Sequence, residues 1–206
     1  MITPTPPAPG SSGRPQGEEF QPTRELVELV PLHASHVDHI MSWVNDREIV
    51  GNLAAFSGQP FTRDDELEYI AKMVTSKDDR VFSIFAPSNN PESSRYLGQC
   101  GIHQIFRRSR VGRASLIVAD RVDMGKGVGS AALARLLDVA FAPAPAGEAL
   151  HKVWLMCFRE NERARRTYAR LGFVEEGVLR EEYLHEDRHR DMVRMSLLDR
   201  EWPRPA

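Results

Sequence analysis

Short apolar runs alternate along this chain between the spacing of strands and the spacing of helices. Period-two or continuous apolar runs predict strands near residues 26–30, 81–86, 96–106, 114–119, 151–158, 173–183 and 192–198. Apolar residues three and four apart predict helices over about 35–45, 62–74, 128–141 and 161–171. The predicted order, β-α-α-β-β-β-α-β-α-β-β, indicates a mixed α/β domain.

Three of these helices carry recognisable end signals. Ser35 is a candidate N-cap for the first helix, because a serine hydroxyl can accept a hydrogen bond from the first-turn amides. Thr62, with an acidic residue three positions further on, matches the pattern of a capping box. Asn161 is expected to cap the last helix, which should stop at Gly172, since glycine readily adopts the left-handed conformation.

The composition changes near residue 22. Residues 1–22 contain six of the fourteen prolines, together with Gly and Ser and almost no apolar residue. Such a segment cannot offset its loss of conformational entropy by burying apolar surface, so we expect a disordered tail over 1–22. The remaining residues, 23–206, have the ordinary length of one globular domain.

Charge and cysteine content indicate the setting of the protein. A net charge of -2 gives no electrostatic reason to expect nucleic acid or a membrane as a partner. Cys100 and Cys157 lie in apolar strand-like runs, so we expect buried free thiols rather than a disulfide. We see no apolar stretch of membrane-spanning length and no signal-peptide pattern. These features predict a cytoplasmic protein.

A glycine-rich turn connects a predicted strand to a predicted helix in the middle of the chain. Gly125, Gly127 and Gly129 stand at alternate positions. Glycine lets the backbone turn tightly and approach a ligand, and a helix N-terminus attracts anions such as phosphates. The spacing differs from the G-x-G-x-x-G of dinucleotide-binding proteins and from a P-loop. We therefore predict a site for a phosphate-bearing cofactor, with an ordinary turn as the alternative.

The second informative stretch is the last predicted helix. Asn161 and Tyr168 are two turns apart, and Gly172 and Phe173 follow the helix directly. Together with the glycine-rich turn, this order resembles the GNAT superfamily of acyl-CoA-dependent N-acetyltransferases over about residues 25–202. The chain resembles most the branch that holds spermidine acetyltransferases and enzymes that acetylate ribosomal-protein N-termini. The resemblance implies a centrally splayed, mixed sheet flanked by helices, and direct acetyl transfer from acetyl-CoA to an amine in a ternary complex.

The resemblance also implies which residues bind acetyl-CoA. The glycine-rich turn would hold the pyrophosphate by its backbone, through the segment Met124, Gly125, Lys126, Gly127, Val128, Gly129 and Ser130. The preceding strand would hold the pantetheine arm by its backbone, through Ile117, Val118 and Ala119. The last helix would contribute Asn161, Ala164, Arg165, Arg166 and Tyr168. Tyr168 would also protonate the departing thiolate, because a phenol is a proton donor; the alternative is a core tyrosine.

Two positions depart from the family pattern. Met124 stands where relatives usually have Gln or Arg, which removes a side-chain contact but leaves the backbone amides. Residues 113–115 read Arg-Ala-Ser in a region where many relatives carry a Glu that acts as base. His103 on the neighbouring strand is a candidate base, since an imidazole titrates near neutral pH. The alternatives are a structural role for His103, proton loss to solvent, or another base among Asp120, Glu182 and His185.

The acceptor is expected to be an amine, and acidic residues in the flanking segments favour a cationic one. These residues are Asp64, Asp65, Glu66, Glu68, Glu181, Glu182, Glu186 and Asp187. A polyamine, an aminoglycoside-type antibiotic and a protein N-terminus are the candidates, although ordinary solvated faces have the same composition. We predict no metal site, because nothing completes a ligand set with the histidines at 33, 36 and 39.

A second class of function is a non-catalytic acyl-CoA-binding sensor or interaction module. The missing strand Glu favours this alternative, whereas the presence of Tyr168 argues for an enzyme. The pattern is compatible with a monomer or a homodimer.

Overall fold

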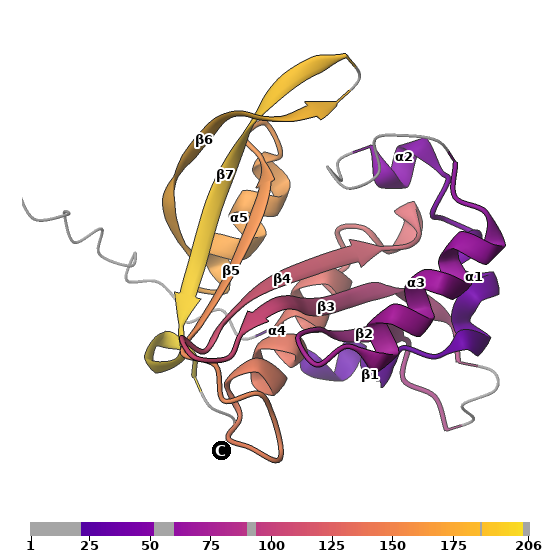
Figure 1. Cartoon of the computed structure of the whole chain (residues 1–206), viewed down its shortest axis with the longest axis horizontal. Coiled ribbons are helices and arrows are strands. Elements are labelled where there is room, and N and C mark those ends of the chain that lie inside the picture. The colour runs from indigo at the N-terminus through magenta and orange to yellow at the C-terminus, as the bar shows by residue number, and fades with distance from the viewer. Residues whose placement is uncertain (1–21, 52–59, 90–93, 186, 204–206) are drawn as a thin grey trace, which may run out of the picture.

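The computed structural model describes residues 22–51, 60–89, 94–185 and 187–203, so the predicted tail lies outside it except for its last residue. Within these ranges seven strands form one sheet in the order β1-β2-β3-β4-β5-β7-β6 (Figure 1). The strands are β1 (Glu28–Pro31), β2 (Arg80–Phe85), β3 (Tyr96–Phe106), β4 (Val111–Val118), β5 (Lys152–Phe158), β6 (Val174–His185) and β7 (Arg188–Leu198). The helices are α1 (Val37–Met41), α2 (Arg47–Val50), α3 (Arg63–Thr75), α4 (Val128–Phe141) and α5 (Glu162–Arg170).

One pair of neighbouring strands differs from all the others. β4 and β5 run parallel, and their register covers only three positions, from Val111 with Lys152 to Arg113 with Trp154. Beyond this contact β4 stays beside β3, whereas β5 stays beside β7. The sheet is therefore splayed at its centre, as predicted, and its two halves separate there (Figure 1).

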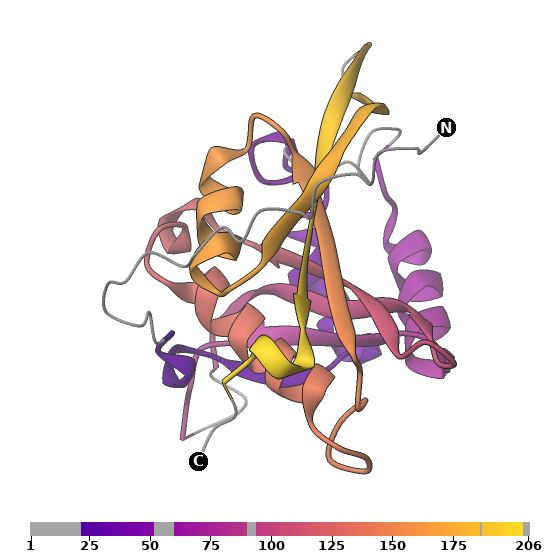
Figure 2. The same ribbon diagram turned by 90° about the vertical axis from the view of Figure 1, so that its left-hand side faces the viewer.

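The last two strands form a long twisted hairpin. β6 and β7 extend past the rest of the sheet (Figure 2). We predicted strands over 173–183 and 192–198, but β6 continues to His185 and β7 begins at Arg188. The polar side chains of this segment are thus part of the strands, because strands exposed on both faces need no apolar alternation.

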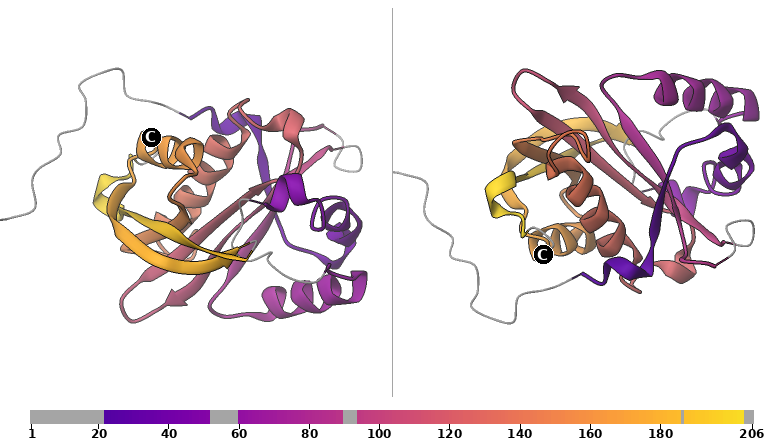
Figure 3. Two further views of the ribbon diagram at one scale, coloured as in Figure 1. Left: turned by 90° about the horizontal axis from the view of Figure 1, so that it is seen from above. Right: turned by 90° about the horizontal axis from the view of Figure 1, so that it is seen from below.

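Two separate apolar cores cover the two faces of the first half of the sheet. α4 packs on β3 and β4 over the larger core, in which Leu133 and Leu136 are fully buried. α1 and α3 pack on each other over the smaller core, around Trp43 and Ile70. Figure 3 shows α4 and the α1–α3 pair on opposite sides of the sheet. None of the helices in the described part of the chain has the length and hydropathy of a membrane-spanning segment.

Two predicted helix termini are confirmed. At α3, Thr62 Oγ1 accepts from the N–H of Asp65 at 3.2 Å, and Asp65 Oδ2 accepts from the N–H of Thr62 at 2.7 Å. This is the predicted capping box. At α5, Asn161 Oδ1 accepts from the N–H of Ala164 at 3.1 Å. The helix ends before Gly172, whose φ of 96° is the left-handed conformation expected there.

The first helix differs from its prediction at both ends. Ser35 lies inside a 3-10 turn over residues 34–36, and its N–H donates to His33 Nδ1 at 3.2 Å. α1 begins only at Val37 and ends at Met41, and the short helix α2 follows it. The prediction of Ser35 as the cap is wrong, because the imidazole of His33 takes that role.

Asp138 on α4 joins both ends of the described chain to the larger core. Its carboxylate accepts from Arg24 Nε at 2.6 Å and from Trp202 Nε1 at 2.8 Å. The Arg24 guanidinium also lies 5.3 Å from the centre of the Trp202 ring. The Arg24 and Asp138 side chains are only 20% and 22% exposed, so water replaces these bonds poorly.

We predict that Asp138→Ala lowers the free energy of unfolding by about 1–3 kcal/mol, because it leaves the Arg24 and Trp202 donors without their acceptor. Urea denaturation measures this change. Glu68→Ala is the matched control: Glu68 is exposed on α3 and makes no hydrogen bond or ion pair to any residue that the structure describes. Its substitution should change stability by less than about 0.5 kcal/mol. Equal effects of the two substitutions would contradict the role of Asp138.

Candidate active site

A gap in the hydrogen-bonded ladder opens between β4 and β5 after Arg113. The N–H of Ala119 donates to the carbonyl of Leu97 on β3 at 2.8 Å. The carbonyl of Ile117 also faces β3, where a side chain on Gly98 would collide with it. Because successive strand residues point their backbone groups to opposite edges, Val118 presents its N–H and C=O to the gap. Of Ile117, Val118 and Ala119, which were predicted to bind the pantetheine arm through their backbone, Val118 is therefore the one whose backbone groups face the gap.

The glycine-rich turn leads from β4 into α4, and within it the N–H of Lys126 already donates to the carbonyl of Asp123 at 3.4 Å. Gly125 and Gly127 have φ of 87° and 89°, a conformation that a Cβ disfavours. Gly127 is the N-cap of α4, and the first helical bond runs from the N–H of Ala131 to its carbonyl at 2.9 Å. The N–H groups of residues 128–130 therefore have no partner within the helix. An anion such as a pyrophosphate fits this end of α4.

Two contacts fix the turn against the sheet. A Cβ on Gly129 would lie at ordinary van der Waals distances, 3.4 Å from Leu116 and 3.6 Å from Val118, so the first turn of α4 lies directly against β4. Arg95 Nη2 donates to Asp123 Oδ1 at 2.9 Å, one bond of a bidentate pair. The hydrogen bonds from Arg95 lower the pKa of Asp123, whose side chain is 3% exposed. The approach to the turn is thus held by an ion pair between a buried aspartate and an exposed arginine.

An open pocket lies beside the turn, lined by Glu48, Arg121, Met124 and Arg163. Arg121 forms an ion pair with Glu48 of α2. The guanidinium of Arg163 on α5 lies 3.6 Å from the position that a Cβ would take on Gly125. Arg163 has no acidic partner among the residues that the structure describes, so its charge is available to an anion bound at the turn.

The two arginines predicted for the site make other contacts. Arg165 Nη2 donates to Glu175 Oε2 on β6 at 3.0 Å. Arg166 Nη1 donates to Glu162 Oε2 at 2.7 Å, an exposed pair within α5. The side chain of Arg163, rather than that of Arg165 or Arg166, thus lies beside the turn. Glu162, four residues before Arg166, was the sequence signal that could have separated them.

Tyr168 projects from α5 against the larger core. Its ring lies 6.0 Å from the ring of Phe173, which follows the helix. Burial, and to a smaller extent the neighbouring Cys157, raises the pKa of the phenol. Cys100 and Cys157 are buried free thiols, as predicted, and burial raises the pKa of Cys157 to about 11. At neutral pH Tyr168 is therefore protonated and able to donate its proton.

His103 on β3 is held from both sides. Its Nδ1 lies 3.0 Å from Asp79 Oδ1, and its Nε2 lies 2.9 Å from Ser115 Oγ on β4. Burial lowers the pKa of His103; Asp79 acts in the opposite direction, and Arg113 lowers it further. His103 is thus a neutral, oriented imidazole. Sequence reasoning missed Asp79 and Ser115, because contacts across strands depend on the register.

The other candidate bases have different surroundings. Asp120 Oδ1 accepts from the N–H of Val122 at 3.0 Å and caps a 3-10 turn. Glu182 is exposed on β6. His185 is buried against Phe158, with ring centres 5.1 Å apart. Among the candidates, His103 is the one whose two ring nitrogens both have side-chain partners.

Taken together, the elements that border the gap carry three groups of interest: the start of α4 follows β4, α5 with the partly buried Tyr168 follows β5, and His103 lies on β3 beside β4. This arrangement suits an extended ligand that carries phosphate at one end and a leaving group at the other. The phosphate would lie at the turn, and the leaving group would take a proton from Tyr168.

Comparisons with known proteins agree with this geometry. The sequence matches the family described as Acetyltransferase (GNAT) domain over residues 27–174. The spermidine N(1)-acetyltransferase of Vibrio cholerae serotype O1 is 30% identical over 141 residues, which are 68% of this chain and 76% of that protein. A Bacillus subtilis protein named "Putative ribosomal N-acetyltransferase YdaF" is 31% identical over 105 residues, 51% of this chain and 55% of that protein. The match thus spans about half the length of the Bacillus protein.

A solved structure is similar over nearly its whole length. It is the crystal structure of spermidine N-acetyltransferase from Vibrio cholerae in complex with CoA and spermine, with a TM-score of 0.74 and 25% sequence identity. The similarity covers 85% of this chain and 97% of that one. On the family match, the relatives and the splayed fold together, the chain belongs to the GNAT family of acetyltransferases, enzymes with acetyl-CoA as cosubstrate.

Proposed function

We propose that this protein transfers the acetyl group of acetyl-CoA to a primary amine of a small polyamine-type cation, by direct attack in a ternary complex. The observation that carries the proposal is the gap between β4 and β5, which adjoins both the anion-binding turn and the strand that leads to α5. One relative is named for spermidine, and the similar structure holds CoA and spermine. A polyamine is therefore the first acceptor to test, with a protein N-terminus and an aminoglycoside as comparisons.

On this proposal, the chain binds acetyl-CoA mainly through its backbone. The free N–H groups at the start of α4 bind the pyrophosphate, and Arg163 adds a positive charge beside it. Val118 holds the pantetheine arm through its N–H and C=O, which face the gap. Ile117 and Ala119 pack against the smaller core beneath α1 and α3, and they shape the wall of the gap there. We place the acceptor amine on this face of the sheet and call it the acceptor side.

The chemistry then needs a neutral amine on one side and a proton donor on the other. The amine nitrogen attacks the thioester carbon, the carbon–nitrogen bond forms and the carbon–sulfur bond breaks. Tyr168 gives its proton to the departing sulfur, which a phenol kept protonated by burial is suited to do.

Acidic residues on α3 support a cationic acceptor. Glu66 is 6% exposed, and burial, aided by Asp65, raises its pKa. An ammonium group bound nearby would favour the ionised carboxylate. Asp64 and Glu68 extend the same helix surface to solvent, whereas Glu186 of the predicted acidic set lies outside the described residues.

We predict that Arg163→Ala weakens CoA binding about three- to tenfold, because it removes a positive charge at the anion-binding turn. Isothermal titration at two salt concentrations measures the loss, and the wild type should show the steeper salt dependence. The matched control is Arg170→Ala, which removes an exposed charge from the same helix and should change the affinity by less than about twofold. Equal losses would contradict a specific role for Arg163.

We predict that Tyr168→Phe lowers kcat about 10²- to 10³-fold and leaves CoA affinity unchanged, because it removes only the donated proton and keeps the ring. Thiol release from acetyl-CoA is measured with spermidine, an N-terminal peptide and an aminoglycoside. Full activity of the variant would refute the acid role. Absence of turnover by the wild type with every amine would refute the proposed transfer.

A further inference from the structure

Three polar side chains form a continuous hydrogen-bonded chain on the acceptor side of the sheet. Asp79 lies just before β2, His103 on β3 and Ser115 on β4, joined by the contacts of 3.0 and 2.9 Å described above. Ser115 shares a face of β4 with Ile117 and Ala119, which pack against the smaller core beneath α1 and α3. The chain is thus on the face opposite to the larger core, which Tyr168 contacts.

The charges fix the direction of these hydrogen bonds. Although burial alone would raise the pKa of Asp79, its hydrogen bonds with Ser76, His103 and Gln104 lower it, so the carboxylate is ionised. An ionised carboxylate only accepts, and Nδ1 of His103 must therefore carry the proton. Nε2 is then the acceptor, and the hydroxyl of Ser115 donates to it. The lone pairs of Ser115 are left to accept a further proton.

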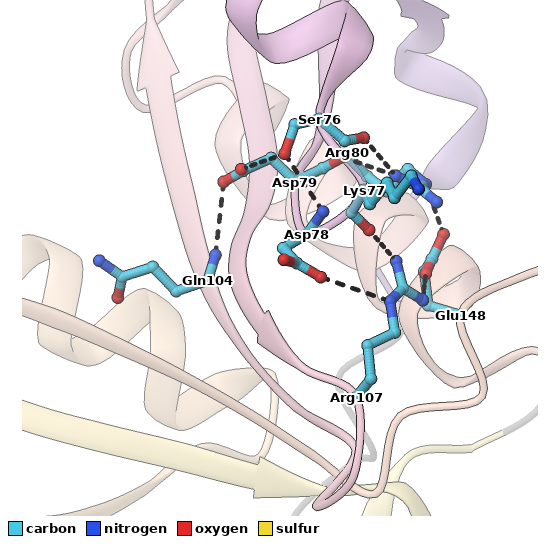
Figure 4. A network of polar contacts seen from close by, with 8 residues as sticks. All are labelled: Ser76, Lys77, Asp78, Asp79, Arg80, Gln104, Arg107 and Glu148. Carbon is cyan, nitrogen blue, oxygen red and sulfur yellow. Dashed lines mark hydrogen bonds and ion pairs between the residues drawn. The ribbon is translucent and has the colours of Figure 1, made fainter.

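The carboxylate of Asp79 is itself held in place (Figure 4). Ser76 Oγ donates to its Oδ2 at 2.6 Å, and the N–H of Gln104 reaches its Oδ1 at 3.3 Å. Gln104 has a φ of 52°, and the β3–β4 register is irregular between His103 and Phe106. Left-handed backbone at a residue other than glycine is uncommon and occurs often at functional sites. Here it directs a backbone donor to the carboxylate that orients His103.

The ring of His103 reaches Ser115 across a glycine. In the register His103 pairs with Arg113, whereas Gly101 pairs with Ser115. A Cβ on Gly101 would lie 3.0 Å from Nε2, so glycine leaves room for the ring. Ser115 is two residues past the last β4–β5 pair and is partly exposed, whereas the His103 side chain is 12% exposed. A ligand in the gap therefore approaches the imidazole through the serine hydroxyl.

We propose that Ser115 takes the proton of the acceptor amine and passes its own proton to Nε2 of His103, with Asp79 as a positioning residue. This relay rests on the acetyl transfer proposed above. As the carbon–nitrogen bond forms, one amine proton moves to Ser115 Oγ while the hydroxyl proton moves to His103. The sulfur leaves with the proton of Tyr168. His103 then releases its proton to solvent and Tyr168 takes one back, so no further reactant is needed.

The surroundings keep His103 ready to accept a proton. Burial and Arg113 lower its pKa, and Asp79 partly opposes them. From α3, Glu66 and Tyr69 face this region; burial raises the pKa of Tyr69 to about 12, with smaller effects of Glu66, Asp79 and Arg113. Activity should therefore be lost on the acid side, below the ordinary histidine pKa of about 6.5.

Substitution of Ser115 tests the relay directly. With saturating spermidine, Ser115→Ala should lower kcat about 10²-fold, whereas Ser115→Thr, which keeps a hydroxyl, should restore most of it. Affinity for CoA should not change. Ser196→Ala is the matched control, because Ser196 is a strand serine, 7% exposed, whose hydroxyl donates to Glu176 at 2.8 Å. Its kcat should equal that of the wild type.

The histidine and the aspartate give independent readouts. His103→Gln should lose as much as Ser115→Ala, and the double variant should lose no more, because the two residues act as a unit. Asp79→Asn should lower kcat and move the acid limb of its pH profile to lower pH, since Asp79 raises the pKa of His103. A merely structural aspartate would change stability without moving that limb.

Several results would overturn the relay. Unchanged kcat in Ser115→Ala, or additive losses in the double variant, would show that the two residues do not share a proton path. Acetylation of Ser115 on mixing with acetyl-CoA alone would make it a nucleophile instead. Absence of amine-dependent thiol release by the wild type would refute the proposed transfer and the relay with it, whereas release that survives Ser115→Ala would refute the relay alone.

Discussion

The short parallel contact between β4 and β5 is the constraint on which the rest of the site depends. The pairing of the two strands stops at Arg113, whereas β4 continues beside β3 and β5 continues beside β7. Backbone groups that face the resulting gap need partners, because unpaired polar groups are costly to bury. Helices on both faces close off the first half of the sheet. The remaining opening leads to the unpaired amides of α4.

The proposed proton donor and the proposed proton acceptor lie on opposite faces of the sheet. Tyr168 contacts the larger core beneath α4, whereas Ser115 and His103 belong to the side of α1 and α3. Burial raises the pKa of the phenol and lowers that of the imidazole. Each group is thus held in the protonation state its proposed role requires, and a thioester between them could be attacked from one side and protonated from the other.

Features with a local cause could be predicted from the sequence. The capping box at Thr62, the cap at Asn161 and the left-handed Gly172 depend on residues within one or two helical turns, and all three are confirmed. The prediction of Ser35 as a helix cap was wrong because His33, two positions earlier, takes the capping role. The partners of His103 depend on strand register and on the left-handed Gln104, which no local pattern reveals. The splay itself followed only from the resemblance, since neither strand's sequence marks where parallel pairing stops.

The most direct test of the gap as the cofactor site is the response of individual backbone amides to CoA, followed by NMR and hydrogen exchange. We expect the amides of Val118 and residues 128–130 to shift and to exchange more slowly when CoA binds. The amide of Ala119 should change little in exchange, because it already donates to Leu97. Changes confined to the β6–β7 hairpin, with Val118 and the start of α4 unaffected, would contradict the assignment.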